Sequence, residues 1–199
     1  MTKSNKTTII TLVVMAVIAV AIFFGYYQMT SKTPEEEVTV AKTEADKLIQ
    51  KDMENNYPGT PREVLKLHGR ITQCIYNDEL NMNQLEGLLE QARKLYDDEL
   101  LALNPWDTHL NNLIADMEDY EKNDRTIMSY TVQNSSQIKT QKIDGEEYAI
   151  AYMLFITSDK SAAYTESCEK FMLKKDGTGD WKIIGWELAD PKSVEIGDE

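Results

Sequence analysis

The sequence predicts an α+β fold in which helices come first and an antiparallel sheet follows. Apolar side chains recur at helical spacing between cap signals over residues 30–124. From residue 125 onward the apolar period shortens to two, and turn signals separate the apolar runs. Helices and strands that are segregated along a chain in this way form a sheet with helices on one face. We therefore expect about four amphipathic helices and a four-stranded antiparallel sheet with a cone-like curvature.

Each of the four expected helices begins at a cap signal. Thr33 and Thr60 each precede a proline and lie three residues before a glutamate, which is typical of a capping box with proline at the first helical position. Asn81 lies three residues before Gln84 and starts the third helix, and Asn104 precedes the proline that starts the fourth. The apolar stripes of the four helices run over residues 41–53, 64–75, 85–103 and 110–120.

The four expected strands are joined by short turns. Alternation at Met128, Tyr130 and Val132 predicts the first strand. The Asp-Gly pair at 144–145 is a hairpin signal, and residues 148–157 are apolar on both faces, which is typical of a central strand covered on both sides. The last two strands are expected at residues 163–175 and 181–188, with turns over 158–161 and 176–180.

An apolar segment without any charged residue precedes this domain, at residues 8–29. As a helix it would be roughly 33 Å long, which is enough for a bilayer core of about 30 Å. We interpret it as a retained transmembrane helix rather than a cleaved signal peptide, because the apolar run continues past the small-residue cleavage pattern. Lys3 and Lys6 precede the segment, which predicts a cytoplasmic N-terminus and an extracytoplasmic C-terminal domain. The predicted localisation is the cell membrane, as a single-pass protein in contact with the lipid bilayer.

The chain is acidic, with 21 lysines and arginines against 34 aspartates and glutamates and a formal net charge of -13. The acidic excess lies after residue 32, and a domain of this charge repels nucleic acid and anionic lipid head groups. We expect no nucleic-acid partner. We divide the chain into a cytoplasmic N-terminus (1–7), a transmembrane helix (8–29), an ectodomain and an acidic tail (191–199). The ectodomain consists of a helical region (30–124) and a sheet packed on it (125–190).

Two resemblances to known families add expectations to this reading. The closing segment GDWKIIGWEL resembles the last strands of nuclear-transport-factor-2-like (cystatin-like) domains. That resemblance implies a bent sheet wrapped on helices, with a cone-shaped cavity between them. The short basic start, the single apolar span and the segments YPGTPREV and DELLALNPW are similar to an uncharacterised domain-of-unknown-function family of bacterial single-pass membrane proteins. The second resemblance implies no particular activity.

Chemistry-bearing motifs are sparse. No GxSxG, HExxH, P-loop or dinucleotide-binding pattern occurs, and we expect no catalytic residue, no metal site and no cofactor. A ligand pocket is a hypothesis: His68 and Asp116 lie on helix faces, where either could place an ionisable group at the base of a cavity. Tyr130, Tyr152 and Trp186 could supply the aromatic wall that is typical of ligand sites, and packing in the core is the alternative role for them.

The two cysteines, Cys74 and Cys168, have two interpretations. Outside the membrane they could form a disulfide, since their number is even. Alternatively, Cys74 shares an apolar helix face with Leu67 and Ile71, where a free thiol behaves as a small apolar side chain. The sequence leaves both interpretations open.

Two functional hypotheses follow from these observations. The favoured one is a non-enzymatic, membrane-anchored extracytoplasmic domain that binds an envelope protein or assembles an envelope complex, through charge complementarity with a basic partner. The alternative is a domain that binds a small molecule, or a cavity enzyme of the isomerase or dehydratase kind. A cavity that contains a perturbed carboxylate or histidine would favour the alternative, and a closed core would favour protein binding.

Overall fold

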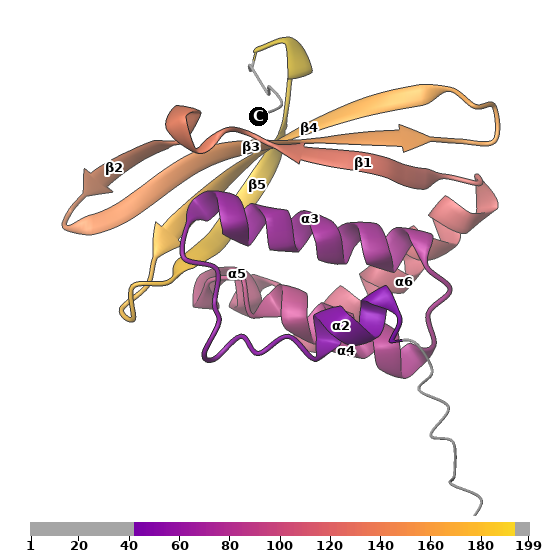
Figure 1. Cartoon of the computed structure of the whole chain (residues 1–199), viewed down its shortest axis with the longest axis horizontal. Helices are drawn as coiled ribbons and strands as arrows, with labels where there is room; N and C mark the ends of the chain where they lie inside the picture. The colour runs from indigo at the N-terminus through magenta and orange to yellow at the C-terminus, as the bar shows by residue number, and fades with distance from the viewer. Residues whose placement is uncertain (1–41, 194–199) are drawn as a thin grey trace, which may run out of the picture. The chain divides into compact units, whose positions relative to one another are not determined.

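The structure is a computed structural model that describes residues 42–193. In this part of the chain five α-helices come first and a five-stranded antiparallel sheet follows (Figure 1). The chain is α+β, but the predicted fold of four helices and four strands is wrong. One predicted helix is split in two, and one strand was not foreseen.

The segment interpreted as a transmembrane helix, residues 8–29, lies outside the described residues. Among the helices between residues 42 and 193, none has the length and apolar character needed to cross a bilayer. The transmembrane part of the predicted fold class therefore has no support from the structure.

Local capping explains where the first two described helices begin. Helix α2 (Glu44–Ile49) starts after Thr43, whose hydroxyl accepts from the Asp46 N–H while the Asp46 carboxylate accepts from the Thr43 N–H. The predicted cap at Thr33 lies outside the described residues. The predicted continuation of that helix through residue 43 is wrong, because Thr43 is the N-cap of α2. Helix α3 (Pro61–Asn77) begins where the sequence predicts.

The expected third helix is two helices, α4 (Met82–Arg93) and α5 (Asp98–Leu103). The link between them leaves the helical path to pair with the sheet: the Ile183 N–H donates to the Leu95 carbonyl at 2.8 Å, and the Asp97 N–H donates to the Ile183 carbonyl at 2.9 Å. These two bonds replace helical bonds that an uninterrupted helix would make. Helix α6 (Trp106–Lys122) follows Pro105 as expected.

The strands are β1 (Thr126–Val132), β2 (Lys139–Ile143), β3 (Glu146–Ser158), β4 (Tyr164–Lys175) and β5 (Trp181–Ala189). The strand order of the sheet is β1-β3-β4-β5, and β2 pairs with β3 on the same side of β3 as β1 does. A short 3₁₀ turn, η1 (Ser135–Gln137), separates β1 from β2. The predicted Asp-Gly hairpin at 144–145 joins β2 to β3, and both of its residues have positive φ, as a tight hairpin turn requires.

All five helices lie on one side of the sheet, with α3 next to the strands and α2 and α4 beyond it (Figure 1). The core is formed by α3, α4 and the inner face of the sheet, where Ala149, Ala151 and Met153 of β3 are fully buried. The opposite face of β3 is only partly buried, as Tyr152 and Leu154 show. Within the described residues, the prediction that this central strand is covered on both sides is therefore wrong.

Helix α3 approaches the sheet closely at Gly69. A Cβ at this position would lie 2.6 Å from Cδ2 of Tyr130 and 3.0 Å from the sulfur of Met153. Both neighbours are packed against the core, so they have little room to move. The glycine therefore sets the distance between α3 and the sheet.

We predict that Gly69→Ala lowers the free energy of unfolding by about 1–3 kcal/mol, because a side chain forced into a packed contact costs about that much. Helix propensity alone would give the opposite sign, since alanine is favoured over glycine in a helix by about 1 kcal/mol. Denaturant unfolding measures the difference. The control is Gly177→Ala, where nothing lies within 4 Å of the added carbon. A Gly69→Ala variant that is more stable than the wild type would contradict the close approach.

Candidate functional site

A cavity of about 360 Å³ lies between helices α3, α4 and α6 and the inner face of the sheet. Its wall is partly aromatic, and polar side chains project into it from both the helices and the strands. The aromatic lining residues are Tyr76, Tyr96, Tyr120, Phe155 and Trp186. The ionisable lining residues other than tyrosine are His68, His109, Asp116 and Glu169.

His68 is buried on α3 with both ring nitrogens engaged. Its Nδ1 lies 3.3 Å from Oγ1 of Thr72, and its Nε2 lies 3.3 Å from the hydroxyl of Tyr96. Because the Thr72 hydroxyl already donates to the His68 carbonyl at 2.9 Å, it accepts from Nδ1–H, and Nε2 accepts from the Tyr96 hydroxyl. Burial, with a smaller contribution from His109, lowers the pKa of His68 to about 4. The imidazole is therefore neutral near pH 7.

A β-bulge in β5 brings Trp186 to the cavity. The register of β4 and β5 shifts between Met172 and Leu173, so that Ile183 and Trp186 both face the helices although they are three residues apart. Trp186 stacks on Phe171 with ring centroids 5.7 Å apart, and its ring also contacts His68 at 5.9 Å. The indole therefore forms a wall between the cavity and the exposed edge of β5.

Glu169 projects into the cavity from β4, on the same face of the strand as the buried Phe171 and Leu173. Burial raises the pKa of its carboxyl to about 7. Among residues 42–193, none forms a hydrogen bond or an ion pair with this carboxyl. The described residues that line the cavity include no lysine or arginine. The cavity therefore contains an acidic group without a protein partner.

The mouth of the cavity lies at its exposed lining residues, which are Asn112 and Asp116 of α6 and Trp186 of β5. His109 accepts a hydrogen bond at Nδ1 from Arg93 at 3.1 Å, and burial followed by the Arg93 charge lowers the pKa of the imidazole. Arg93 also donates to the Asn104 carbonyl at 2.7 Å and lies over the ring of Trp106. These contacts hold the guanidinium outside the cavity lining. Asp116 lies exposed at the rim.

The five pocket residues proposed from the sequence have different places in the structure. His68, Asp116 and Trp186 line the cavity. Tyr130 faces the helices but packs on α3 at Gly69 instead of lining the cavity. Tyr152 lies on the opposite face of the sheet, because its neighbours Ala151 and Met153 occupy the core face and side chains alternate along a strand.

Sequence reasoning missed Glu169 and Tyr96, and it did not assign His109 to the pocket. A signal for Glu169 exists: it precedes Phe171 and Leu173 at a spacing of two, so strand alternation places an acid in line with two core residues. Tyr96 had been assigned to the stripe of an uninterrupted helix. Its position against His68 depends on the break between α4 and α5, which local sequence does not reveal.

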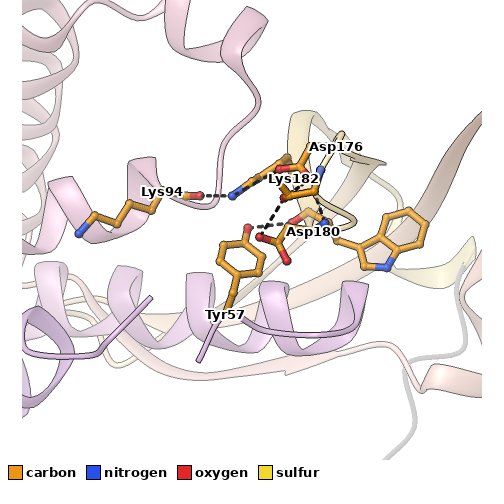
Figure 2. Close-up of polar contacts among 7 residues, drawn as sticks. Tyr57, Lys94, Asp176, Asp180 and Lys182 are labelled. Carbon is orange, nitrogen blue, oxygen red and sulfur yellow. Dashed lines mark hydrogen bonds and ion pairs between the residues drawn. The ribbon is translucent and has the colours of Figure 1, made fainter. Parts of the chain in front are cut away.

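A second polar cluster fastens the β4–β5 turn to the helices (Figure 2). The ammonium of Lys182 lies 3.9 Å from the centroid of the Tyr57 ring, donates to the Lys94 carbonyl at 3.0 Å and pairs with Asp176 at 4.0 Å. The Tyr57 hydroxyl donates to the Trp181 carbonyl at 2.8 Å. Because Lys182 is already held by all three neighbours, we assign this cluster to folding and not to ligand binding.

The two cysteines are free and buried. The Cys74 thiol donates to the Asp78 carboxylate at 3.2 Å, and burial raises its pKa to about 12. Cys168 is buried on β4. Both thiols are therefore buried groups with little thiolate character, and the structure contains no disulfide between them.

We predict that His68 stays neutral, as the Nδ1–H tautomer, down to about pH 5. The unfolded chain takes up a proton on this residue near pH 6.5 and the folded chain only near pH 4. The free energy of unfolding therefore falls as the pH drops through this window, by roughly 3 kcal/mol in total. Imidazole ¹H–¹⁵N NMR reports both the tautomer and the titration, and a His109→Gln variant assigns the two sets of signals. Titration of His68 near pH 6.5 would contradict its burial.

Comparison with known proteins places the chain in a family without an assigned activity. A search of curated proteins gives no match. A model of the family described as a domain of unknown function, DUF6715, matches residues 1–186. The prediction of an uncharacterised domain-of-unknown-function family is thus confirmed, whereas the membrane anchoring attached to it stays a prediction. Because the match covers nearly the whole sequence, the chain belongs to the DUF6715 family.

Proposed function

We propose that this domain binds a small molecule in the cavity between its helices and its sheet. The observation that carries the proposal is the unpartnered Glu169 carboxyl inside a cavity of about 360 Å³ with aromatic walls. Ligand sites have volumes of about 300–1,000 Å³ and combine apolar walls with a few polar groups that orient the ligand. Glu169 is partly buried; a partly buried carboxyl without a protein partner is incompletely solvated, and a bound ligand can supply an interaction that the protein does not.

The chemistry of the lining favours binding over turnover. Both nitrogens of His68 are engaged by Thr72 and Tyr96, so this imidazole has no free lone pair for a ligand proton. His109 is likewise engaged at Nδ1 by Arg93. Glu169 is left as the candidate for proton exchange, and a general acid or base needs a second group to complete a reaction. We therefore place the isomerase or dehydratase role behind simple binding.

The resemblance to nuclear-transport-factor-2-like domains supports the same proposal. It rests on residues 179–188, which include the cavity residue Trp186. A cavity between a helical layer and an antiparallel sheet is what that resemblance implies. The relation itself, the membrane anchor and an extracytoplasmic location stay predictions from the sequence.

We predict that Ser167→Phe abolishes binding of any small molecule that occupies the cavity. Ser167 lines the cavity from β4, and a phenyl ring there would fill part of its volume. The control is Ser129→Phe, which places the same ring on the opposite face of the sheet, where Ser129 pairs with Ile156. A thermal-shift screen of amphipathic fragments with both variants measures the difference. Hits that stabilise Ser167→Phe as strongly as the wild type would place their site elsewhere.

Protein binding is the second candidate, and a separate groove favours it. The groove has a volume of about 630 Å³ and lies between the end of α3, the start of α4 and α6. Its apolar floor includes Leu80, Ile114 and Met117, and Met82 at its edge is about half exposed. Five acidic residues line it: Asp78, Glu79, Glu118, Glu121 and Asp124.

The charge of the groove indicates which partner would fit. The one basic lining residue among those described, Arg125, already pairs with Asp119 at 3.6 Å and lies over the ring of Tyr120. An apolar floor with an acidic rim is complementary to a basic amphipathic segment of another protein. We propose such a segment as the occupant.

We predict that the double variant Glu118→Lys and Glu121→Lys weakens binding of a basic leucine–lysine amphipathic peptide at least tenfold, because two rim charges are reversed. Both residues are exposed near the C-terminus of α6, where lysine is compatible with the helix dipole. The control reverses Glu54 and Glu166, two exposed acids outside the groove. Fluorescence anisotropy with the labelled peptide measures affinity. An equal loss in both double variants would show nonspecific attraction to the acidic surface and would reject the groove.

A further inference from the structure

The charged side chains that line the cavity are acidic. Glu169 and Asp116 are its carboxylates, and no lysine or arginine is among the described residues that line it. Two guanidinium groups lie beside the lining, and both are engaged elsewhere. Arg93 is held by the Asn104 carbonyl, His109 and the Trp106 ring. Arg125 lies over the Tyr120 ring and pairs with Asp119. An anionic ligand would therefore meet a carboxyl group with no compensating cation. A neutral apolar ligand would leave that carboxyl without a partner.

The aromatic side chains of the cavity also favour a positively charged ligand over a neutral or negatively charged one. The rings of Tyr76, Tyr96, Tyr120 and Trp186 all border the cavity that contains Glu169. The negative charge of Glu169 also helps to raise the pKa of each of these three tyrosines, after the larger effect of burial, so the carboxylate lies within electrostatic range of all three. Aromatic faces attract an ammonium group, and the attraction is stronger when the contact is desolvated. An aromatic wall beside an unpaired carboxylate is therefore suited to a cation.

Resting on the proposed function of the cavity, we infer that its ligand is an organic cation, an amine or quaternary ammonium compound whose charged head lies between Glu169 and the aromatic rings. The cation supplies the partner that the Glu169 carboxyl lacks within the described residues, and the carbon body of the ligand contacts apolar lining residues such as Ile71 and Leu113. Asp116, at the exposed rim, attracts the cation toward the mouth without being buried by it.

Cation binding is linked to the protonation of Glu169. The titratable groups that face the cavity come from α3 (His68 and Tyr76), the α4–α5 link (Tyr96), α6 (His109, Asp116 and Tyr120) and β4 (Glu169). Burial lowers the pKa of both histidines and raises that of all three tyrosines. Both directions favour the uncharged form of these side chains near pH 7. Glu169, with a pKa of about 7, changes charge between pH 6 and pH 8. A cation binds its ionised form, so affinity rises with pH across this range.

The test compares choline with its neutral isostere 3,3-dimethylbutan-1-ol, in NMR titrations of residues 1–199. The two probes have the same shape, and the charge of choline does not depend on pH. We expect choline to bind at least tenfold more tightly than the isostere at pH 8. Its affinity should fall roughly tenfold between pH 8 and pH 6, because the ionised fraction of a group with a pKa of about 7 falls by about that factor.

Variants separate Glu169 from the general acidity of the surface. Glu169→Gln should remove both the preference for choline and its pH dependence, while binding of the isostere persists. The matched control is Glu166→Gln on the same strand, where the side chain is exposed and does not line the cavity; it should behave as the wild type does. Thermal unfolding of Glu169→Gln shows whether the variant is folded, and Asp116→Asn provides a second, exposed carboxylate change with a smaller expected loss.

The outcomes distinguish this inference from the proposed function. If the isostere binds as tightly as choline, or if Glu169→Gln keeps the preference for choline, the cation inference is overturned and small-molecule binding stands. Binding of neither probe also overturns the cation inference. The comparison of Ser167→Phe with Ser129→Phe then decides independently whether the cavity binds small molecules of another kind.

Discussion

The arrangement of this domain depends on the pairing of the α4–α5 link with β5. Two backbone hydrogen bonds connect Ile183 to Leu95 and Asp97, at 2.8 and 2.9 Å. They interrupt what would otherwise be one long helix and attach the helical layer to the edge of the sheet. The bond from the Lys182 ammonium to the Lys94 carbonyl, with the Tyr57 ring beneath it, reinforces the same junction (Figure 2). Because a helix C-terminus carries partial negative charge, an ammonium at that carbonyl is favourable.

The same junction creates the candidate site. It places Tyr96 within 3.3 Å of Nε2 of His68, and the bulge that follows Ile183 in β5 turns Trp186 toward both rings. Without the break after α4, Tyr96 would continue around a helix and the cavity would lose one of its walls. On the link, the cavity residue Tyr96 lies between the junction residues Leu95 and Asp97. On β5, the cavity residue Trp186 lies three residues after the junction residue Ile183.

Local signals in the sequence predicted the starts of α3 and α4, although the local cap at Thr43 was missed. The caps at Thr60 and Asn81 are interactions within one turn, and α3 and α4 begin at the predicted residues. The break at Leu95 could not be predicted in this way, since it is stabilised by Ile183, far along the chain. Strand β2 was missed because every one of its side chains is exposed, so it shows no apolar alternation. A strand is recognised from sequence by its buried face, and β2 has none.

For the candidate site, too, the sequence predicted residue types correctly but not every position in the fold. His68 and Trp186 were identified from residue type, whereas Tyr152 was placed on the wrong face of the sheet. Residues 148–157 are apolar at both parities, so the pattern does not say which parity faces the helices. Glu169 was overlooked because an acid on a strand is ordinarily assigned to the solvent side.

The protonation states of His68 and Glu169 determine much of the charge in the cavity. Burial opposes the charged form of both groups, lowering the pKa of the base to about 4 and raising that of the acid to about 7. Between these values both side chains are predominantly neutral, and the cavity is formed at little electrostatic cost. The imidazole is stabilised in that state by Thr72 and Tyr96, but the carboxyl has no such partners among the described residues. The asymmetry matters because a ligand gains little from displacing a satisfied group and much from pairing with an unsatisfied one. Under the proposed function, Glu169 is therefore the group on which the affinity and the selectivity of the cavity would depend.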